Sequence, residues 1–142
     1  MIEVFEKDCL EGMKGLEDNS VDLVITDPPY NITACEWDKK IDLIKLFVEL
    51  KRVTKENSAI LMTASQPFTT NLINAGRDIF RYELIWEKDK ITNFLLLKKQ
   101  IGKIHENILV FCKGQHTYNP IKISANPNKL DKRKRFNKIK FK

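Results

Sequence analysis

The chain has 142 residues, the size of one domain. With 42% apolar and 31% charged residues, its composition is that of an ordinary soluble globular protein. No stretch approaches the ~20 apolar residues that a membrane-spanning helix needs. The first residues also lack the basic and apolar regions of a secretory signal. We therefore expect a cytoplasmic protein without membrane contacts.

The cysteines give no sign of a metal site. Cys9, Cys35 and Cys112 are scattered along the chain and form no Cys-x-x-Cys pair. Neither a zinc site nor a disulfide framework follows from this spacing. We expect three reduced thiols and no metal.

The formal net charge of +6 is concentrated at the end of the chain. Residues 121–142 contain nine Lys or Arg and one Asp, whereas the preceding 120 residues carry a net charge of −2. We therefore separate a body, residues 1–120, from a basic tail, which we expect to be mobile. The tail includes Lys132, Arg133, Lys134 and Arg135. Such a run suits contact with nucleic-acid phosphates, although a solvated chain end would have the same composition.

Apolar periodicity in the body predicts alternating strands and helices. Strands are expected at residues 2–6, 21–26, 59–63, 82–86 and 107–112. Helices are expected to begin near Asp8, at an N-cap residue Asp38 and at Ser65. The last of them should end with Gly76 as its C′ residue, and residues 92–99 fit a short helix or a loop. This order predicts an α/β fold with a mainly parallel sheet and an antiparallel edge strand.

The second predicted strand leads into the most informative segment, Asp27-Pro28-Pro29-Tyr30. Val21 to Thr26 is nearly continuously apolar, which is typical of a central parallel strand covered on both faces. The two prolines end this strand because neither can donate to the hydrogen-bond ladder. Ligands of open α/β sheets bind beyond the carboxyl ends of strands. The segment therefore lies where a ligand site is expected.

These four residues suit the binding of a flat amine. The Asp27 carboxylate and the Pro28 carbonyl are two acceptors for the two hydrogens of an exocyclic NH2 group. Such a grip aims the nitrogen lone pair at an electrophile, and Tyr30 can stack on the ring that carries the amine. Pro28 and Pro29 keep the segment stiff. A rigid turn without chemistry is the alternative interpretation of the tetrapeptide alone.

The wider sequence resembles amino-group DNA methyltransferases of the beta arrangement, in which the catalytic motif precedes the cofactor motif. The resemblance covers roughly residues 1–120. Its motifs include Asp8-Cys9-Leu10-Glu11, Thr26-Asp27-Pro28-Pro29-Tyr30-Asn31-Ile32, Ser65-Gln66-Pro67-Phe68, Ile85-Trp86-Glu87-Lys88, Asn93-Phe94 and His105-Glu106-Asn107-Ile108-Leu109-Val110-Phe111. The fold that it implies is a partial Rossmann-like methyltransferase sheet.

The resemblance implies methyl transfer from S-adenosylmethionine to the exocyclic amine of a base in double-stranded DNA. Asp in the first motif position is more typical of enzymes that methylate adenine N6, whereas those acting on cytosine N4 more often carry Ser. The target base would leave the duplex stack, and Asp27, Pro28, Pro29 and Tyr30 would hold it. Trp86 or Phe94 would form the opposite wall.

The resemblance also places Asp8, Cys9 and Asp27 near the cofactor. For Asp8, capping of the first helix is an equally good interpretation. His105 fits a structural or phosphate-facing role better than catalysis.

The chain departs from the family pattern in its glycines. It contains no Gly-x-Gly, the signature of the segment that binds the methionine part of the cofactor. We therefore expect the catalytic half of such an enzyme, with little activity alone, completed by a C-terminal half or by self-association. The alternatives are an inactive relic that binds DNA through its tail, or an N4-cytosine enzyme. Methylation of a protein glutamine is disfavoured because that motif usually begins with Asn.

Overall fold

The computed structural model describes residues 2–31, 35–36, 38–91 and 93–121. Its helices are α1 (Cys9–Met13), α2 (Leu43–Val53), α3 (Phe68–Ala75) and the short 3₁₀ helix η1 (Phe94–Leu96). Its strands are β1 (Val21–Thr26), β2 (Thr54–Ala64), β3 (Phe80–Glu87) and β4 (His105–Phe111). The α/β class is therefore confirmed, with β1 at the predicted residues and β2, β3 and β4 longer than the apolar runs that predicted them.

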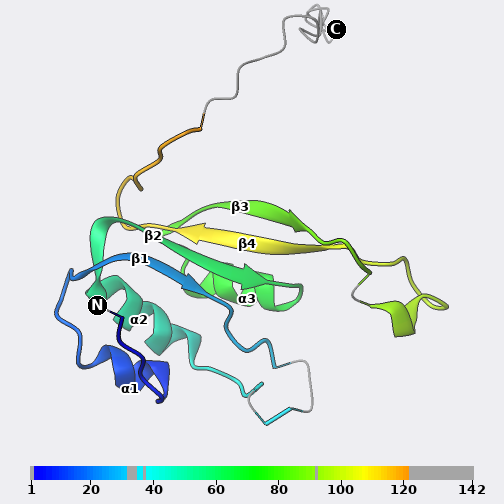
Figure 1. Cartoon of the computed structure of the whole chain (residues 1–142), viewed down its shortest axis with the longest axis horizontal. Coiled ribbons are helices and arrows are strands. Elements are labelled where there is room, and N and C mark those ends of the chain that lie inside the picture. Colours follow the sequence, from blue (N-terminus) through cyan, green and yellow to red (C-terminus); the bar gives the residue numbers. More distant parts are fainter. Residues whose placement is uncertain (1, 32–34, 37, 92, 122–142) are drawn as a thin grey trace, which may run out of the picture.

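The four strands form one mixed sheet in the order β1-β2-β4-β3 (Figure 1). Strand β1 is parallel to β2, whereas β4 is antiparallel to both β2 and β3. The predicted antiparallel pairing of the last two strands is confirmed. Within the described residues, however, one pairing of three is parallel, so the sheet is mixed rather than mainly parallel. The reason is that β3 returns to β4 through residues 88–104 without a crossover helix.

One face of the sheet is covered by α2 and α3 and carries the core (Figure 1). Phe47 of α2 packs edge-on against Phe111 of β4, with ring centroids 4.9 Å apart. Leu46, Leu50, Ile60, Met62, Leu72 and Leu109 complete the centre of this cluster. The apolar stripe predicted for α2 is thus its buried face.

The opposite face of the sheet is open at β1 and β3 in the part of the chain that the structure describes. Register places Ile25 beside Leu61, and Leu61 beside Val110, which is itself buried on β4. Ile25 is 73% exposed and Leu84 of β3 is 46% exposed. The expectation that residues 21–26 form a strand covered on both faces is therefore wrong. Strand β1 is an edge strand here, with one paired neighbour and one bare face.

Two expected elements differ from the structure. Residues 2–6 are not a strand, and Ile2 and Val4 are about 90% exposed, because no described strand pairs with them. The N-cap of α2 is Asp42, whose carboxylate accepts from the Lys45 N–H at 3.1 Å. Asp38 is instead buried and accepts from the Asn31 N–H at 2.6 Å.

Gly76 does follow α3, but it does not adopt the left-handed backbone conformation for which glycine is common after a helix. Its φ is −110°, outside the left-handed region that favours glycine. A Cβ at this position would lie 2.3 Å from Phe47 Cε1. Glycine is needed here because α3 and its following turn approach the core ring so closely.

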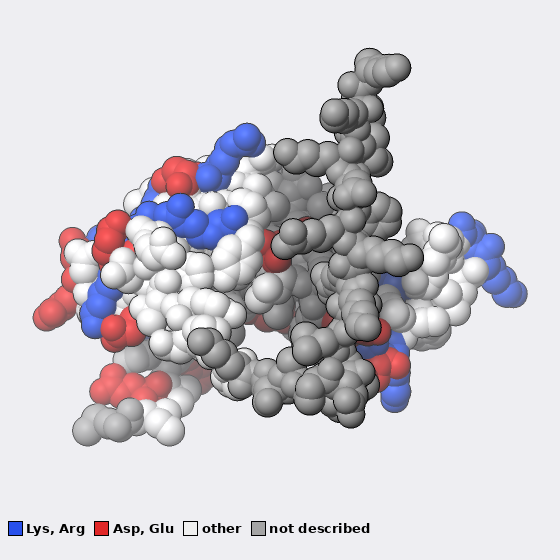
Figure 2. Space-filling model, turned by 90° about the horizontal axis from the view of Figure 1, so that it is seen from above, with Lys and Arg blue, Asp and Glu red and all other residues white. Residues whose placement is uncertain are grey.

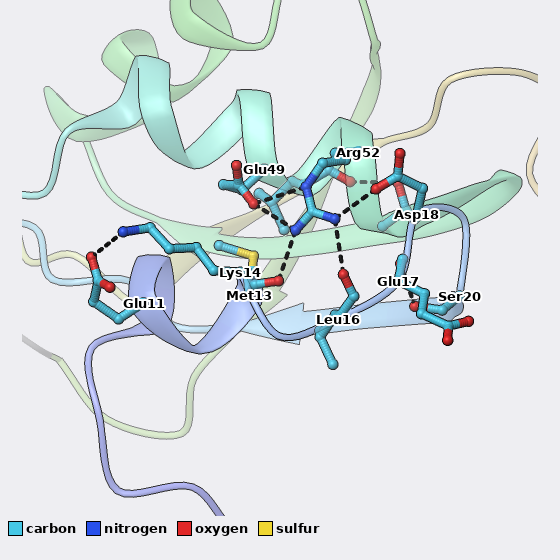
Figure 3. Close-up of polar contacts among 11 residues, drawn as sticks. Glu11, Met13, Lys14, Leu16, Glu17, Asp18, Ser20, Glu49 and Arg52 are labelled. Atoms are coloured by element: carbon cyan, nitrogen blue, oxygen red, sulfur yellow. Dashed lines mark hydrogen bonds and ion pairs between the residues drawn. The ribbon is translucent and has the colours of Figure 1, made fainter.

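Arg52 fastens the segment between α1 and β1 to helix α2 (Figure 3). Its guanidinium donates to the carboxylates of Glu49 and Asp18, at 2.8 and 2.7 Å. It also donates to the carbonyls of Met13 and Leu16. Five-donor guanidinium geometry suits such a fork of acceptors, which ties α1 to the body.

Charged side chains of the body are mixed in sign. Figure 2 shows acidic and basic groups interspersed on the visible face rather than gathered by sign. This pattern agrees with the near-zero net charge of the first 120 residues. The predicted phosphate contacts Lys132, Arg133, Lys134 and Arg135 lie outside the described residues.

Candidate active site

The segment Asp27 to Tyr30 leaves the sheet at the carboxyl end of β1. Parallel pairing brings the end of β2 to the same edge, since Thr26 lies beside Met62. Thr63 therefore stands next to Asp27 in the structure. Asp27 is exposed, Pro28 is buried, and Pro29 and Tyr30 are half-buried. The stiff segment is thus anchored by its proline and presents its carboxylate to solvent.

Three side chains form a closed hydrogen-bonded cluster, which we call the Asp27 cluster (Asp27, Tyr30 and Thr63). The Tyr30 hydroxyl lies 3.0 Å from Asp27 Oδ1 and 3.0 Å from Thr63 Oγ1. The Thr63 hydroxyl donates to the same Asp27 oxygen. A phenol has one proton, so Tyr30 serves one acceptor at a time, while Thr63 can serve the carboxylate continuously.

Tyr30 links the cluster to the core. Its ring stacks on Phe68 of α3, with centroids 5.1 Å apart and planes 25° from parallel. Burial, followed by its bonding with Asp27, raises the pKa of the Tyr30 phenol, although the bond with Thr63 acts in the opposite direction. The phenol therefore remains a proton donor at neutral pH.

The Asp27 cluster leaves acceptor capacity at the sheet edge. Both hydroxyls approach Oδ1, and within the described residues no donor reaches Asp27 Oδ2 or the Pro28 carbonyl. A carboxylate can accept about four hydrogen bonds. We call Oδ2 and the Pro28 carbonyl the acceptor pair, because both retain the capacity to accept from N–H donors.

A groove of about 740 Å³ adjoins the cluster. It lies between the segment after β1, the residues that lead into α2, and α3. Its lining includes Tyr30, Asn31, Lys40, Phe68 and Asn71. Asp27 does not line the groove, so Tyr30 marks the boundary between the groove and the acceptor pair. The groove is large enough for a nucleotide-sized ligand.

The structure does not join Asp8 or Cys9 to this site. The Asp8 carboxylate caps α1 by accepting from the N–H groups of Leu10 and Glu11, at 2.8 and 3.3 Å. Partial burial, followed by the Asp8 charge, raises the pKa of the Cys9 thiol, which is reduced. No hydrogen bond in the described chain connects either residue to the segment Asp27 to Tyr30. The capping role of Asp8 is observed, and a cofactor contact stays a prediction.

The residues expected to form a second aromatic wall are Trp86 and Phe94. Trp86 lies on β3, three interstrand spacings or about 14 Å from β1. The Lys88 ammonium lies over its ring at 4.8 Å. Phe94 belongs to η1, and its side chain lies outside the description. The stacking role of both residues stays a prediction.

Sequence reasoning missed Thr63 and Phe68, which hold Tyr30 from two sides. Thr63 had a usable signal, because it ends the strand predicted at residues 59–63, at the sheet edge where Asp27 leaves the parallel neighbour. Phe68 had none, because its contact depends on how α3 packs against the sheet.

Comparison with known proteins identifies the family. The model of the family described as DNA methylase matches residues 21–141. The chain belongs to this DNA methylase family. The match includes the sheet and the Asp27 cluster, so the family assignment covers the segments that carry the site geometry.

Two curated relatives are similar to the chain. The DNA adenine methyltransferase YhdJ of Escherichia coli strain K12 is 28% identical over 81% of this chain and 42% of its own length. The type II methyltransferase M1.MboII of Moraxella bovis is 26% identical over 82% of this chain and 48% of its own. The chain therefore spans less than half the length of these relatives.

Solved structures share the fold. M1.HpyAVI has a TM-score of 0.65 at 18% identity and covers 89% of this chain and 64% of its own. The cytosine-N4-specific PvuII DNA methyltransferase has a TM-score of 0.57 at 14% identity, and the match covers 78% of this chain and 48% of the PvuII enzyme. These likenesses confirm the expected partial methyltransferase sheet.

Among the described residues, no helix is long and apolar enough to span a membrane. No group of three or more metal-binding side chains comes together in this part of the chain.

Proposed function

We propose that the chain carries the amine-holding part of a DNA methyltransferase that uses S-adenosylmethionine and modifies adenine N6. The observation that supports this most is that both hydroxyls of the Asp27 cluster engage Asp27 Oδ1, while no described donor reaches Oδ2 or the Pro28 carbonyl. It lies at the carboxyl end of a parallel strand, in a chain of the DNA methylase family. Because the substrate would be DNA, we place the protein in the cytoplasm.

The residues of the chain would orient the amine rather than activate it by removing a proton first. Asp27 and the Pro28 carbonyl accept the two N–H bonds, which directs the nitrogen lone pair away from both acceptors. Tyr30 stacks on the extruded base through the ring face not covered by Phe68. When bound, the cofactor would supply an electrophilic methyl group and leave as a neutral thioether. On methylation the nitrogen would gain positive charge, which the nearby Asp27 carboxylate would stabilise until the nitrogen releases a proton.

The described residues fit only one side of a cofactor pocket. Beside Asp27 they offer an open sheet edge, but the chain has no Gly-x-Gly turn. We propose that the other side comes from a complementary segment or a second subunit that adds to the β1 edge. The basic tail, with Lys132 to Arg135, would contact DNA phosphates.

Adenine is the preferred target over cytosine on two grounds. Position 27 is Asp, and the relative YhdJ is an adenine methyltransferase. The structural neighbour PvuII methyltransferase acts on cytosine N4, so an N4-cytosine enzyme is the second candidate.

The test is identification of the methylated nucleoside. Duplex DNA is incubated with labelled S-adenosylmethionine and either the chain alone or the chain joined to the part of YhdJ that its match leaves uncovered. We expect N6-methyladenine from the joined protein and little product from the chain alone. N4-methylcytosine as the product would overturn the adenine assignment. Robust transfer by the chain alone would overturn the proposed need for a second part.

A further inference from the structure

We propose that Thr63 is a positioning residue of the amine-holding site, acting through its hydroxyl on Asp27 and Tyr30. This inference rests on the proposed function and names a residue outside the Asp27 to Tyr30 segment. Thr63 lies on β2, one strand away from the segment that it holds.

Thr63 stands on a rigid support. It is paired with Ile108 of β4, and the residue before it, Met62, is paired with Thr26 of β1, so the backbone that carries Thr63 is held firmly. A β-branched side chain has few χ1 rotamers, which fixes the hydroxyl as well. Asp27, in contrast, follows the last residue of β1 and is exposed.

The hydroxyl of Thr63 also determines which oxygen of the Asp27 carboxylate stays available. The terminal torsion of an aspartate is broad, so an exposed carboxylate rotates easily. The Thr63 hydroxyl binds Oδ1, and the Tyr30 hydroxyl approaches that same atom at 3.0 Å. Engaging one oxygen orients the group and leaves Oδ2 for the substrate amine.

Thr63 also fixes the ring of Tyr30. Tyr30 is held at its hydroxyl by Thr63, at 3.0 Å, and along its ring by Phe68. Thr63 therefore couples the hydrogen-bonding and stacking parts of the site. Loss of its hydroxyl should weaken recognition of the amine more than binding of the ring itself.

The test measures that selectivity on the 142-residue chain. Adenine and 6-(dimethylamino)purine, which lacks both N–H donors, are titrated while the amide NMR signals of Asp27, Tyr30 and Asn31 are followed. We expect wild type to bind adenine about tenfold more tightly, as for hydrogen bonds to a charged group. Thr63→Val should reduce this ratio to about threefold or less, and Thr63→Ser should retain the wild-type ratio.

The variants separate the possible outcomes. An unchanged ratio in a folded Thr63→Val protein would overturn the positioning role while leaving the proposed function intact. No selectivity in wild type would count against the proposed function itself. If Thr63→Val does not fold, the comparison of Thr63→Ser with Thr63→Ala decides, because the smaller pair differs only in the hydroxyl. Equal ratios for these two would likewise overturn the role.

Discussion

The two faces of the sheet differ in what they do with apolar side chains. On the face covered by α2 and α3, Phe47, Ile60 and Phe111 are at most 1% exposed. On the open face, Ile25 and Leu84 are 73% and 46% exposed. The covered face supplies the cohesion of the described chain, whereas the open face has apolar area available for another contact. The Asp27 cluster spans both, since Tyr30 packs on Phe68 and its hydroxyl meets Thr63 of the open face.

Truncating the covered core should have the largest effect. Phe111→Ala removes a ring that packs on Phe47 and Phe80, and should lower the free energy of unfolding by about 3–5 kcal/mol. Ile25→Ala, on the open face, should change it by less than about 0.5 kcal/mol. Urea unfolding of both variants measures the difference. Equal losses would show that the faces do not differ as described.

Removal of the Arg52 clamp should have an intermediate effect. Arg52→Ala leaves the carboxylates of Glu49 and Asp18 and two carbonyls without their shared donor. We expect a melting temperature lower by a few degrees, with little recovery in Arg52→Lys, since an ammonium cannot reproduce the fork. Thermal melts followed by circular dichroism test this, and full recovery with Lys would refute the geometric argument.

Tyr30 should make stability depend on alkaline pH. Its phenol pKa is raised in the folded chain, so the unfolded phenol ionises first, near pH 10. The stabilisation is complete below that pH and is lost as pH rises further, because the unfolded state then binds fewer protons. Tyr30→Phe should flatten this loss between about pH 10 and 11.5 in urea titrations. If the free energy of unfolding of Tyr30→Phe fell with pH as steeply as that of wild type, the folded chain would not raise the pKa of the Tyr30 phenol.

The open face should influence association rather than stability. Ile25→Lys introduces a charge into the exposed apolar area, and should reduce self-association in sedimentation velocity at high concentration while leaving the unfolding midpoint unchanged. Asp22→Lys on the same strand is the control for added positive charge, because Asp22 is already polar and exposed and loses only a surface ion pair with Lys55. Equal effects of both variants would indicate a general charge effect.

The sequence predicted the order of elements because α2 and the strands carry clear apolar periodicity. It also predicted the site segment, since Asp27 to Tyr30 follows an apolar strand. The open face could not be predicted from Val21 to Thr26 alone. A nearly continuous apolar run is what a strand buried on both faces would have, yet here such a run belongs to a strand with one exposed face. Asp38 and Asp42 are equally suitable N-cap residues by type. The sequence could not choose between them, because Asp38 is buried by tertiary packing. Thr63 was missed because its partner is 36 residues away in the chain.

The most direct test of the account compares Asp27→Ala with Asp22→Ala in methyl transfer by the joined protein. Both variants remove an exposed carboxylate, but only Asp27 belongs to the acceptor pair. The account predicts that Asp27→Ala lowers the single-turnover rate by roughly 10²–10³-fold, as for loss of a group that stabilises transition-state charge. Asp22→Ala should stay close to the wild-type rate. Similar rates for the two variants would contradict the claim that Asp27 holds the amine.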